Sequence, residues 1–338
     1  SKKYILAALV TGVIVVLPMF FYILNNQAAL LRVTGTSIFS YKTELLKTNI
    51  QKLERDQASG DRLGQVFDNR RIVYAKTIIS GYISHFDPNW LFIKGDIARH
   101  HAPNMGLLYL FEVPFILFGI YLLLFSDFNK KTKLLIFAWL LLSPVPASIT
   151  TGVPHAVRTL NFLPTWQIIS AIGIVYSFSY INKFKKAKYV ALLVFALIFI
   201  FNFSYFLNQY FVQQNYYHSA DWQYGYREAV REVLKLQDKY DQIVISDNQP
   251  MDKSYMFFLF YLKFPPSEYQ KIGEKSSGSF DSHHSFGRYT FRGIDWQKDR
   301  LSKKTLFVGP PNDIPDGVSL IRTIYNLDGS VAIRITGT

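Results

Sequence analysis

The chain contains no cysteine, which excludes a disulfide framework, a thiolate metal site and a cysteine nucleophile. Charged residues are also scarce: they make up 18% of the 338 residues, against 49% for hydrophobic and 17% for aromatic residues. A composition so poor in charge and so rich in apolar side chains excludes disordered, collagen-like and coiled-coil chains. It also argues against an ordinary soluble protein.

The sequence lacks the short motifs of several enzyme classes. It contains no phosphate-cradling GxxxxGK[ST] loop, no GxGxxG after a strand, no HExxH and no GxSxG. Nucleotide-driven transport and serine hydrolysis therefore find no support. A secondary transporter would show paired broken spans in two similar halves, whereas the sequence has one proline-broken span.

Long apolar stretches dominate what is present. Five of them are almost free of charge and lie close to the roughly 20 residues that a helix needs to cross a bilayer. They cover residues 4–24, 105–126, 134–151, 159–181 and 189–209. The first is too long for a signal peptide and has no small-residue cleavage site. We therefore predict an α-helical polytopic membrane protein with five transmembrane helices.

The lysines predict the orientation of these helices. The formal net charge is +13, and most of the excess lies in three short segments that flank the apolar stretches and contain Lys2, Lys3, Lys130, Lys131, Lys133, Lys183, Lys185, Lys186 and Lys188. Lysine-rich flanks of spans lie on the cytoplasmic side, so we expect a multi-pass plasma-membrane protein with its N-terminus inside and its C-terminus outside. Because these lysines flank spans instead of an aromatic-bearing folded surface, we predict no nucleic-acid partner.

This topology divides the chain into four regions: a first transmembrane helix (1–24), an extracytoplasmic loop (25–104), a four-helix transmembrane region (105–209) and an extracytoplasmic α/β domain (210–338). In the loop, apolar residues recur at three- and four-residue spacing from Ile38 through Tyr41 and Leu45 to Leu53. This spacing predicts an amphipathic helix, which could lie on the membrane surface or pack on a small core of the loop's own.

The last region alternates helical and strand patterns. YREAVREVLKLQDKY favours a helix, QIVIS and TLFVG favour strands, and the apolar run SYMFFLFYLKF is too short to cross a membrane and favours a buried helix. VSLIRTIY and VAIRIT, joined through NLDGS, predict a hairpin with an Asp-Gly turn. We expect a compact domain of about 120 residues outside the membrane.

The stretch LLLSPVPASITTGVPHAVRTL contains the first candidate site residues. Its prolines should end the third span early and leave unpaired backbone, which is tolerated only inside protein or beside a watery cavity. His155 and Arg158 follow, three residues apart, and a guanidinium with an imidazole at this level would suit a lipid-linked phosphate. Alternatively, Arg158 simply anchors the span at the headgroups.

Other polar residues extend the candidate pocket. Glu112 is the only charge inside a predicted span, about 10 Å from its outer end, and could pair with Arg158 or His155, bind a polar ligand, or make a structural helix-to-helix hydrogen bond.

Asp87, Asp96, His100 and His101 could line the same cavity or bind a metal, but their loose spacing favours solvated surface residues. His283 and His284 lie in GSFDSHHSFG, a polar segment that we expect to be a loop without chemistry.

The runs HFDPNWLFIKGDIARHHAPNMGLLYLFEVPFILFGIYLLL and SPVPASITTGVPHAVRTLNFLPTWQIISAIG resemble the C-terminal half of bacterial GT-C glycosyltransferases related to protein O-mannosyltransferases and aminoarabinose transferases. The similarity covers most of residues 5–210, and PHAVRTL and GLLYLFEVPFILFG are its most specific parts. The resemblance implies a polyprenyl-phosphate-linked sugar as donor and transfer to an acceptor on the outer face of the membrane, usually with inversion.

The resemblance also implies roles for single residues. His155 and Arg158 match the outer-loop motif that faces the donor phosphate, and Glu112 matches the acidic position of the preceding span. The family's catalytic aspartate lies in an N-terminal half that this sequence does not contain, so we expect the chain to be a C-terminal part that is inactive alone. Arg158 would stabilise charge on the departing phosphate, a role that a dissociable divalent metal could share, although no ligand set here has convincing spacing.

The alternative belongs to another class. A membrane-anchored, non-enzymatic binding or assembly protein would need no active carboxylate and would use the outer α/β domain for recognition. We therefore keep this interpretation beside the transferase.

Overall fold

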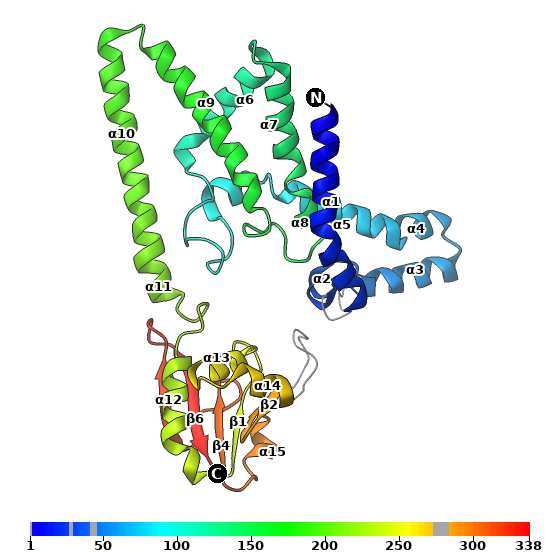
Figure 1. Cartoon of the computed structure of the whole chain (residues 1–338), viewed down its shortest axis with the longest axis vertical. Coiled ribbons are helices and arrows are strands. Elements are labelled where there is room, and N and C mark those ends of the chain that lie inside the picture. The colour runs from blue at the N-terminus through cyan, green and yellow to red at the C-terminus, as the bar shows by residue number, and fades with distance from the viewer. Residues whose placement is uncertain (1, 27–29, 41–45, 273–283) are drawn as a thin grey trace.

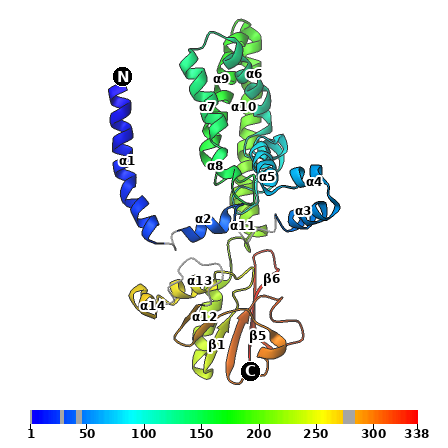
Figure 2. The same cartoon turned by 90° about the vertical axis from the view of Figure 1, so that its right-hand side faces the viewer.

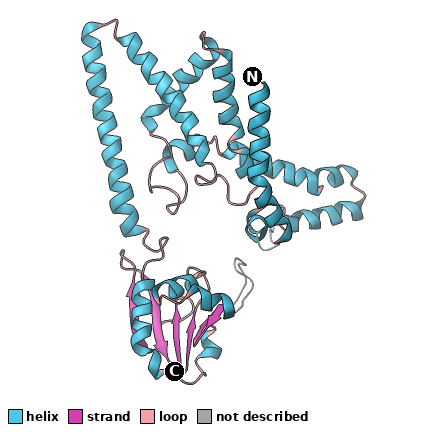
Figure 3. Cartoon of the chain, viewed as in Figure 1, coloured by secondary structure: helices cyan, strands magenta, loops and turns pink. Residues whose placement is uncertain are grey.

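The computed structural model describes residues 2–26, 30–40, 46–272 and 284–338. It is mostly helical and ends in a mixed β-sheet (Figures 1 and 3). The five helices that correspond to the predicted spans are α1 (Lys2–Asn25), α6 (Val113–Phe125), α7 (Lys130–Leu142), α9 (Leu163–Ile181) and α10 (Lys185–Asn208).

Three helical stretches among the described residues are long and apolar enough to cross a membrane: Lys2–Asn25, Leu160–Ile181 and Lys186–Tyr217. The last includes α10, a π-helical turn and α11 (Gln214–Tyr217). The second and third predicted spans are shorter than expected, because one apolar helix covers only Leu110–Phe125 and α7 has 13 residues.

Prolines explain where the two shorter helices begin and end. Pro114 lies in the first turn of α6, where its missing N–H costs no helical hydrogen bond, and residues 105–109 before it are not helical. At the other break, α7 ends at Leu142, before Pro144, and the chain continues through the short helix α8 (Val145–Ser148). The predicted early end of this helix is therefore confirmed, whereas its crossing of the membrane stays a prediction.

Two glycines set how closely α6 and α9 approach each other. A Cβ atom built on Gly119 would lie 2.1 Å from the carbonyl oxygen of Ile169, and one on Gly173 would lie 1.9 Å from the carbonyl oxygen of Phe115. Because both obstacles are backbone atoms, no side-chain movement could relieve them. Small residues that allow backbones to meet are the usual basis of helix packing in lipid, where apolar burial between helices gives little.

The predicted outer loop is largely helical and consists of α2 (Leu31–Thr36), α3 (Lys47–Ser59), α4 (Arg62–Phe67) and α5 (Arg70–Ser84). Tyr41 and Leu45 of the predicted amphipathic helix lie outside the described residues, whereas Ile38 is buried in an irregular segment before it. α3 lies beside α4 but buries none of its residues, so the described part of the loop shows no buried core beneath it. In Figure 1, α3 and α5 run across the direction of α1, α7 and α10.

The C-terminal region forms a six-stranded sheet in the order β2-β3-β1-β4-β6-β5, in which β1 is parallel to β3 and β4. Its elements are α12 (Tyr226–Leu236), β1 (Gln242–Ile245), α13 (Ser254–Tyr261), α14 (Pro266–Ile272), β2 (His284–Phe286), β3 (Tyr289–Phe291), α15 (Trp296–Asp299), β4 (Thr305–Gly309), β5 (Leu320–Tyr325) and β6 (Val331–Gly337). The predicted helices, strands and hairpin are all present.

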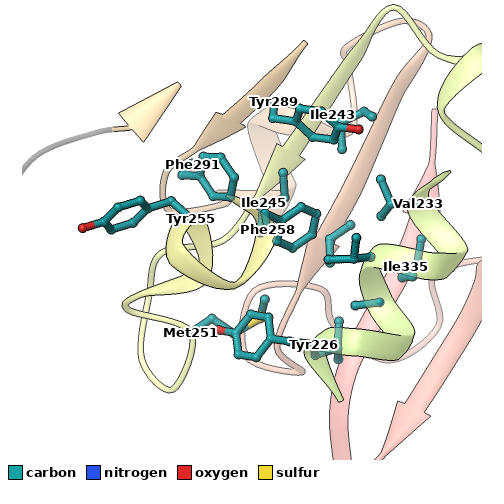
Figure 4. Packing of buried hydrophobic residues seen from close by; sticks show 14 of the residues in the cluster. Tyr226, Val233, Ile243, Ile245, Met251, Tyr255, Phe258, Tyr289, Phe291 and Ile335 are labelled. Carbon is teal, nitrogen blue, oxygen red and sulfur yellow. The ribbon is translucent and has the colours of Figure 1, made fainter. Parts of the chain in front are cut away.

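Alternation along the central strand builds a core on each face of the sheet. Ile243 and Ile245 of β1 pack against α12 and α13, where Val233 and Phe258 are fully buried (Figure 4). Val244, between them, points to the opposite face and joins a second apolar cluster beside α15. Side chains of a strand alternate between faces, so one short apolar strand supports both layers.

One prediction for this domain was wrong. The polar segment that contains His283 and His284 was expected to be a loop, but His284 begins β2, is 6% exposed and stacks on the Tyr255 ring at 3.6 Å between centroids. His283 lies outside the described residues. The strand was missed because one of its two buried residues is a polar histidine; the other is Phe286.

The glycine contact between α6 and α9 gives a first testable prediction. Replacement of Gly173 by leucine should lower the free energy of unfolding by about 1–3 kcal/mol or more, because the new side chain would collide with the backbone of α6. Replacement of Gly12 by leucine is the matched control, since a Cβ there has no heavy atom within 4 Å. Thermal unfolding in detergent measures both, and equal stability of the two variants would contradict the close approach.

Candidate functional site

Two irregular segments meet at one end of the long helices. The first, residues 85–109, follows α5, and the second, residues 143–162, follows α7. Both lie at the end of α6, α7 and α9 that faces the α/β domain (Figure 1). The N-terminus and the α6–α7 and α9–α10 connections, which carry the lysine segments, lie at the other end (Figure 2 gives the perpendicular view).

A glycine shapes the first segment. After a π-helical turn at Trp90–Lys94, Gly95 has φ +66° and ψ −157°, a conformation that side chains with a Cβ rarely adopt. A Cβ at this position would also lie 2.3 Å from the ring of His101. The resulting turn places Asp96 directly after it, and the Asp96 carboxylate accepts the N–H of Ile97 at 2.7 Å.

Backbone contacts hold the second segment against its neighbours. Thr150 pairs with Ser37 as an isolated antiparallel bridge, and the N–H of Thr151 donates to the Thr36 carbonyl at 2.8 Å. The Arg158 guanidinium closes the segment on itself, because its Nη1 donates to the Thr150 hydroxyl and to the Thr151 carbonyl, each at 2.6 Å. This exposed arginine therefore has a structural contact as well as a charge.

The Asp96 carboxylate joins the two segments. Its Oδ2 accepts the N–H of Ala156 at 2.7 Å, lies 3.2 Å from Nδ1 of His100 and lies 3.9 Å from Nδ1 of His155. The rings of His100 and His155 stack with centroids 4.3 Å apart and planes 21° from parallel. The three groups form one Asp–His–His cluster, with one ligand atom from each within 4.8 Å of the others.

The cluster is partly buried. The exposed fractions are 9% for the Asp96 side chain, 20% for His100 and 13% for His155. The prediction that Asp96 and His100 are solvated surface residues was therefore wrong. Asp87, by contrast, is exposed, and its carboxylate caps the Asn89 N–H at 2.9 Å.

The surroundings favour a neutral His155. Burial, followed by the charges of Arg158 and His100, lowers the pKa of the His155 imidazole. Its Nδ1 accepts the N–H of Arg158 at 3.4 Å, which assigns the proton of the neutral ring to Nε2. A neutral imidazole can offer an N–H donor on one side and a lone pair on the other.

His85 contacts the backbone of His155, although no sequence pattern singled it out. It is fully buried, and burial lowers the pKa of its imidazole. Its Nδ1 is 2.7 Å from the Gly81 carbonyl, so Nδ1 donates and Nε2 is left as the acceptor for the N–H of His155 at 3.4 Å. The sequence signal that could have pointed to His85 is its position two residues before Asp87. An isolated histidine after a helix does not by itself indicate a functional site.

His101 and Glu112, two further predicted pocket residues, do not join the cluster. His101 turns into its own loop, where Nε2 lies 3.0 Å from the Gly106 carbonyl and Nδ1 is buried without a hydrogen-bond partner among the described residues. Burial lowers the pKa of this imidazole.

Glu112 ends the 3₁₀ turn Leu110–Glu112, which leads directly into α6 within the apolar stretch Leu110–Phe125, and its position inside a span stays a prediction. Its carboxylate accepts the Tyr109 N–H at 3.3 Å and also hydrogen-bonds to the Ser170 side chain of α9. The structural helix-to-helix hydrogen bond is therefore the alternative that the described residues support, and a carboxylate here also faces the positive end of a helix.

α10 and α11 are both hydrogen-bonded to the loop that carries the cluster. Gln214 donates to the Ala98 carbonyl at 2.6 Å, and the Tyr205 hydroxyl donates to the Asn104 carbonyl at 3.1 Å. Since α12 of the α/β domain follows soon after, these bonds connect the domain to the loop between Asp96 and Tyr109. Comparisons with family models, with curated proteins and with solved structures find no match.

The turn at Gly95 gives the second prediction. Gly95→Ala should loosen the loop that carries Asp96 and His100, because the new methyl group meets the His101 ring and the Met105 carbonyl oxygen at 2.5 Å. Gly152→Ala is the control, because Gly152 shares a positive φ of +68° but a Cβ on it would have no heavy atom within 4 Å. Amide hydrogen exchange of residues 95–108 should quicken about 10-fold or more in the first variant only, and equal protection would refute the steric account.

Proposed function

We propose that this protein binds the phosphate of a polyprenyl-phosphate-linked sugar and takes part in transfer of that sugar to an acceptor on the outer face of a membrane. The carrying observation is the meeting of Asp96, His100 and His155 beside Arg158, at the end of the helices opposite the lysine segments. The resemblance of the two quoted runs to GT-C glycosyltransferases supports the same class of reaction.

The proposed topology has five spans, with the lysine segments in the cytoplasm. Lysine flanks mark that side, and all three segments lie at one end of the helices (Figure 1). The 13 residues of α7 cover only about 20 Å, less than the roughly 30 Å of a bilayer core. Its span is completed by residues 143–151 after Leu142, and non-helical backbone at such depth is tolerated where it is buried in protein or lines a watery cavity.

The chemistry proposed for the site is electrostatic. As the bond from the anomeric carbon to the phosphate breaks, negative charge builds up on the departing phosphate, and a fixed cation stabilises that charge more than it stabilises the ground state. Arg158 supplies the cation, and its contacts with Thr150 and Thr151 fix the direction of the guanidinium. His155 supplies a neutral Nε2–H donor next to it.

The acceptor's proton requires a general base, for which we assign no residue of this chain. Asp96 is a poor candidate, because both of its oxygens already accept backbone N–H groups. A base must reach the proton that it removes, and a carboxylate so engaged serves better to hold a loop or a ligand.

A second candidate function rests on the α/β domain. A groove of about 780 Å³ runs along α12 and is lined by Trp222, Tyr224 and Tyr261 together with Arg227 and Arg231. Aromatic faces beside arginines suit recognition of another molecule. This favours a membrane-anchored binding protein if the phosphate site fails.

The orientation can be tested in intact cells, because the chain has no native cysteine. Single cysteines at Val157 and Asp328, both exposed, should react with a membrane-impermeant thiol reagent, whereas one at the exposed Ala187 should react only after the cells are opened. Labelling of Ala187 in closed cells would place the lysines outside and contradict the proposed topology.

Phosphate binding can be tested with a short-chain polyprenyl phosphate titrated into the purified full-length protein in detergent. We expect binding of the phosphate but not of the corresponding polyprenol. Arg158→Ala should weaken binding about 10- to 100-fold, as loss of a charge-assisted hydrogen bond of about 1.5–3 kcal/mol requires.

Thr150→Val is the matched control for this titration. It removes one of the two contacts that hold the guanidinium but keeps the charge, so it should retain most of the affinity. An equal loss of affinity in both variants would mean that Arg158 only holds the loop in place. Equal binding of polyprenol and polyprenyl phosphate would contradict the phosphate site.

A further inference from the structure

We propose that Asp96, His100 and His155 bind one divalent metal ion of the Zn²⁺ type, through Oδ2 of Asp96 and one nitrogen of each imidazole. Spacing along the chain does not indicate this set, because His155 lies more than fifty residues from the other two. The fold brings its ring into a stack with His100 at the same carboxylate oxygen.

The distances suit a small metal ion. Ligand bonds of about 2.0–2.1 Å in a tetrahedral site put neighbouring ligand atoms about 3.3 Å apart. Oδ2 of Asp96 lies 3.2 Å from Nδ1 of His100 and 3.9 Å from Nδ1 of His155. All three ligand atoms lie within 4.8 Å of one another. To close around one ion, the two imidazoles must turn out of their stack so that a lone pair of each points at it, and Nδ1 of His155 must give up the N–H of Arg158.

The donor set selects the class of metal. Two imidazoles with one carboxylate match the nitrogen-rich sites of Zn²⁺ and other late divalent metals, whereas Mg²⁺ and Ca²⁺ prefer sites made of oxygen. The sets of two histidines and one acidic residue that bind catalytic zinc leave a coordination position for water or substrate. An ion held by these three residues would keep such a position.

Neighbouring groups already orient the three side chains. The N–H groups of Ile97 and Ala156 each donate to the Asp96 carboxylate at 2.7 Å and fix its plane. His85, fully buried, supports the backbone of His155 from behind. Such outer contacts orient the ligands of metal sites.

A simple histidine–aspartate pair elsewhere in the chain provides a comparison. His218 and Asp221 also place Nδ1 and Oδ2 3.1 Å apart, but their side chains are 33% and 41% exposed. No third histidine or acidic ligand from the described part of the chain completes a set with this pair. The Asp96 cluster differs by its third donor and by its burial.

In the transfer reaction, the ion would hold an oxygen of the donor phosphate at its open position; this role rests on the proposed function, whereas metal binding itself does not. Arg158 and the ion would then share the negative charge of the departing phosphate. No bond to the metal has to break before the sugar is transferred, so the ion acts by charge alone.

The test uses the purified full-length protein in detergent, stripped with a chelator and titrated with Zn²⁺ by calorimetry and with Co²⁺ by visible absorption. We expect one ion per chain and Co²⁺ bands of low coordination number. His100→Ala and His155→Ala should each weaken binding at least 10- to 100-fold, the cost of losing even an outer-shell partner. His218→Ala, which removes an equally close histidine–aspartate pair, should bind as the wild type does.

The outcomes separate the two proposals. Absence of stoichiometric binding, or equal loss in His218→Ala, overturns the metal site and leaves the polyprenyl-phosphate titration as it stands. If an ion binds, addition of inorganic phosphate should shift the Co²⁺ bands of the wild type; unchanged bands overturn the role in phosphate binding. Thermal unfolding without metal checks that each variant is folded.

Discussion

The Asp96 carboxylate is the contact on which the polar part of this protein depends. It accepts backbone N–H groups from its own loop and from the loop after α7, and it receives two stacked imidazoles on the same side. A carboxylate with so little exposure is costly to bury without such partners. Each partner in turn is fixed by the fold, since His155 follows the proline-rich break and His100 follows the turn at Gly95. The two loops therefore have one relative position in which these polar groups are satisfied together.

The helices and the C-terminal domain set the frame for this contact. The close approach of α6 and α9 fixes where residues 105–112 and 159–162 leave the helical layer. Hydrogen bonds from Tyr205 of α10 and Gln214 of α11 then fasten this helical stretch to the loop that carries the cluster. The α/β domain has its own core on both faces of its sheet and needs no helix of the apolar region to complete it. The site thus lies at the end of the apolar helical bundle that faces a domain with its own core (Figure 1).

Much of this fold could be predicted from the sequence, and the reasons for the exceptions are physical. Apolar length predicted α1, α9 and α10, and the prolines predicted the break after Leu142, because both signals are local. The start of α6 was misplaced because apolar residues 105–109 look like helix until Pro114 is taken as a first-turn residue. The strand at His284 was missed because its alternation is only three residues long. Asp96 and His100 could be named from the sequence as possible metal ligands, but spacing could not add His155 to them, since it meets Asp96 only through tertiary structure. A buried histidine such as His85 has no sequence signature of its own.

The glycine contacts between α6 and α9 have a mechanical consequence. Two helices whose backbones touch cannot slide or roll past each other without separating, so this pair behaves as a single rigid strut. The apolar stretches of α1 and α10, by contrast, have no residue that the rest of the described chain buries. A swing of α10 or α1 therefore disturbs less packing than a movement within the α6–α9 pair, and α10 would carry the loop and the sheet domain with it.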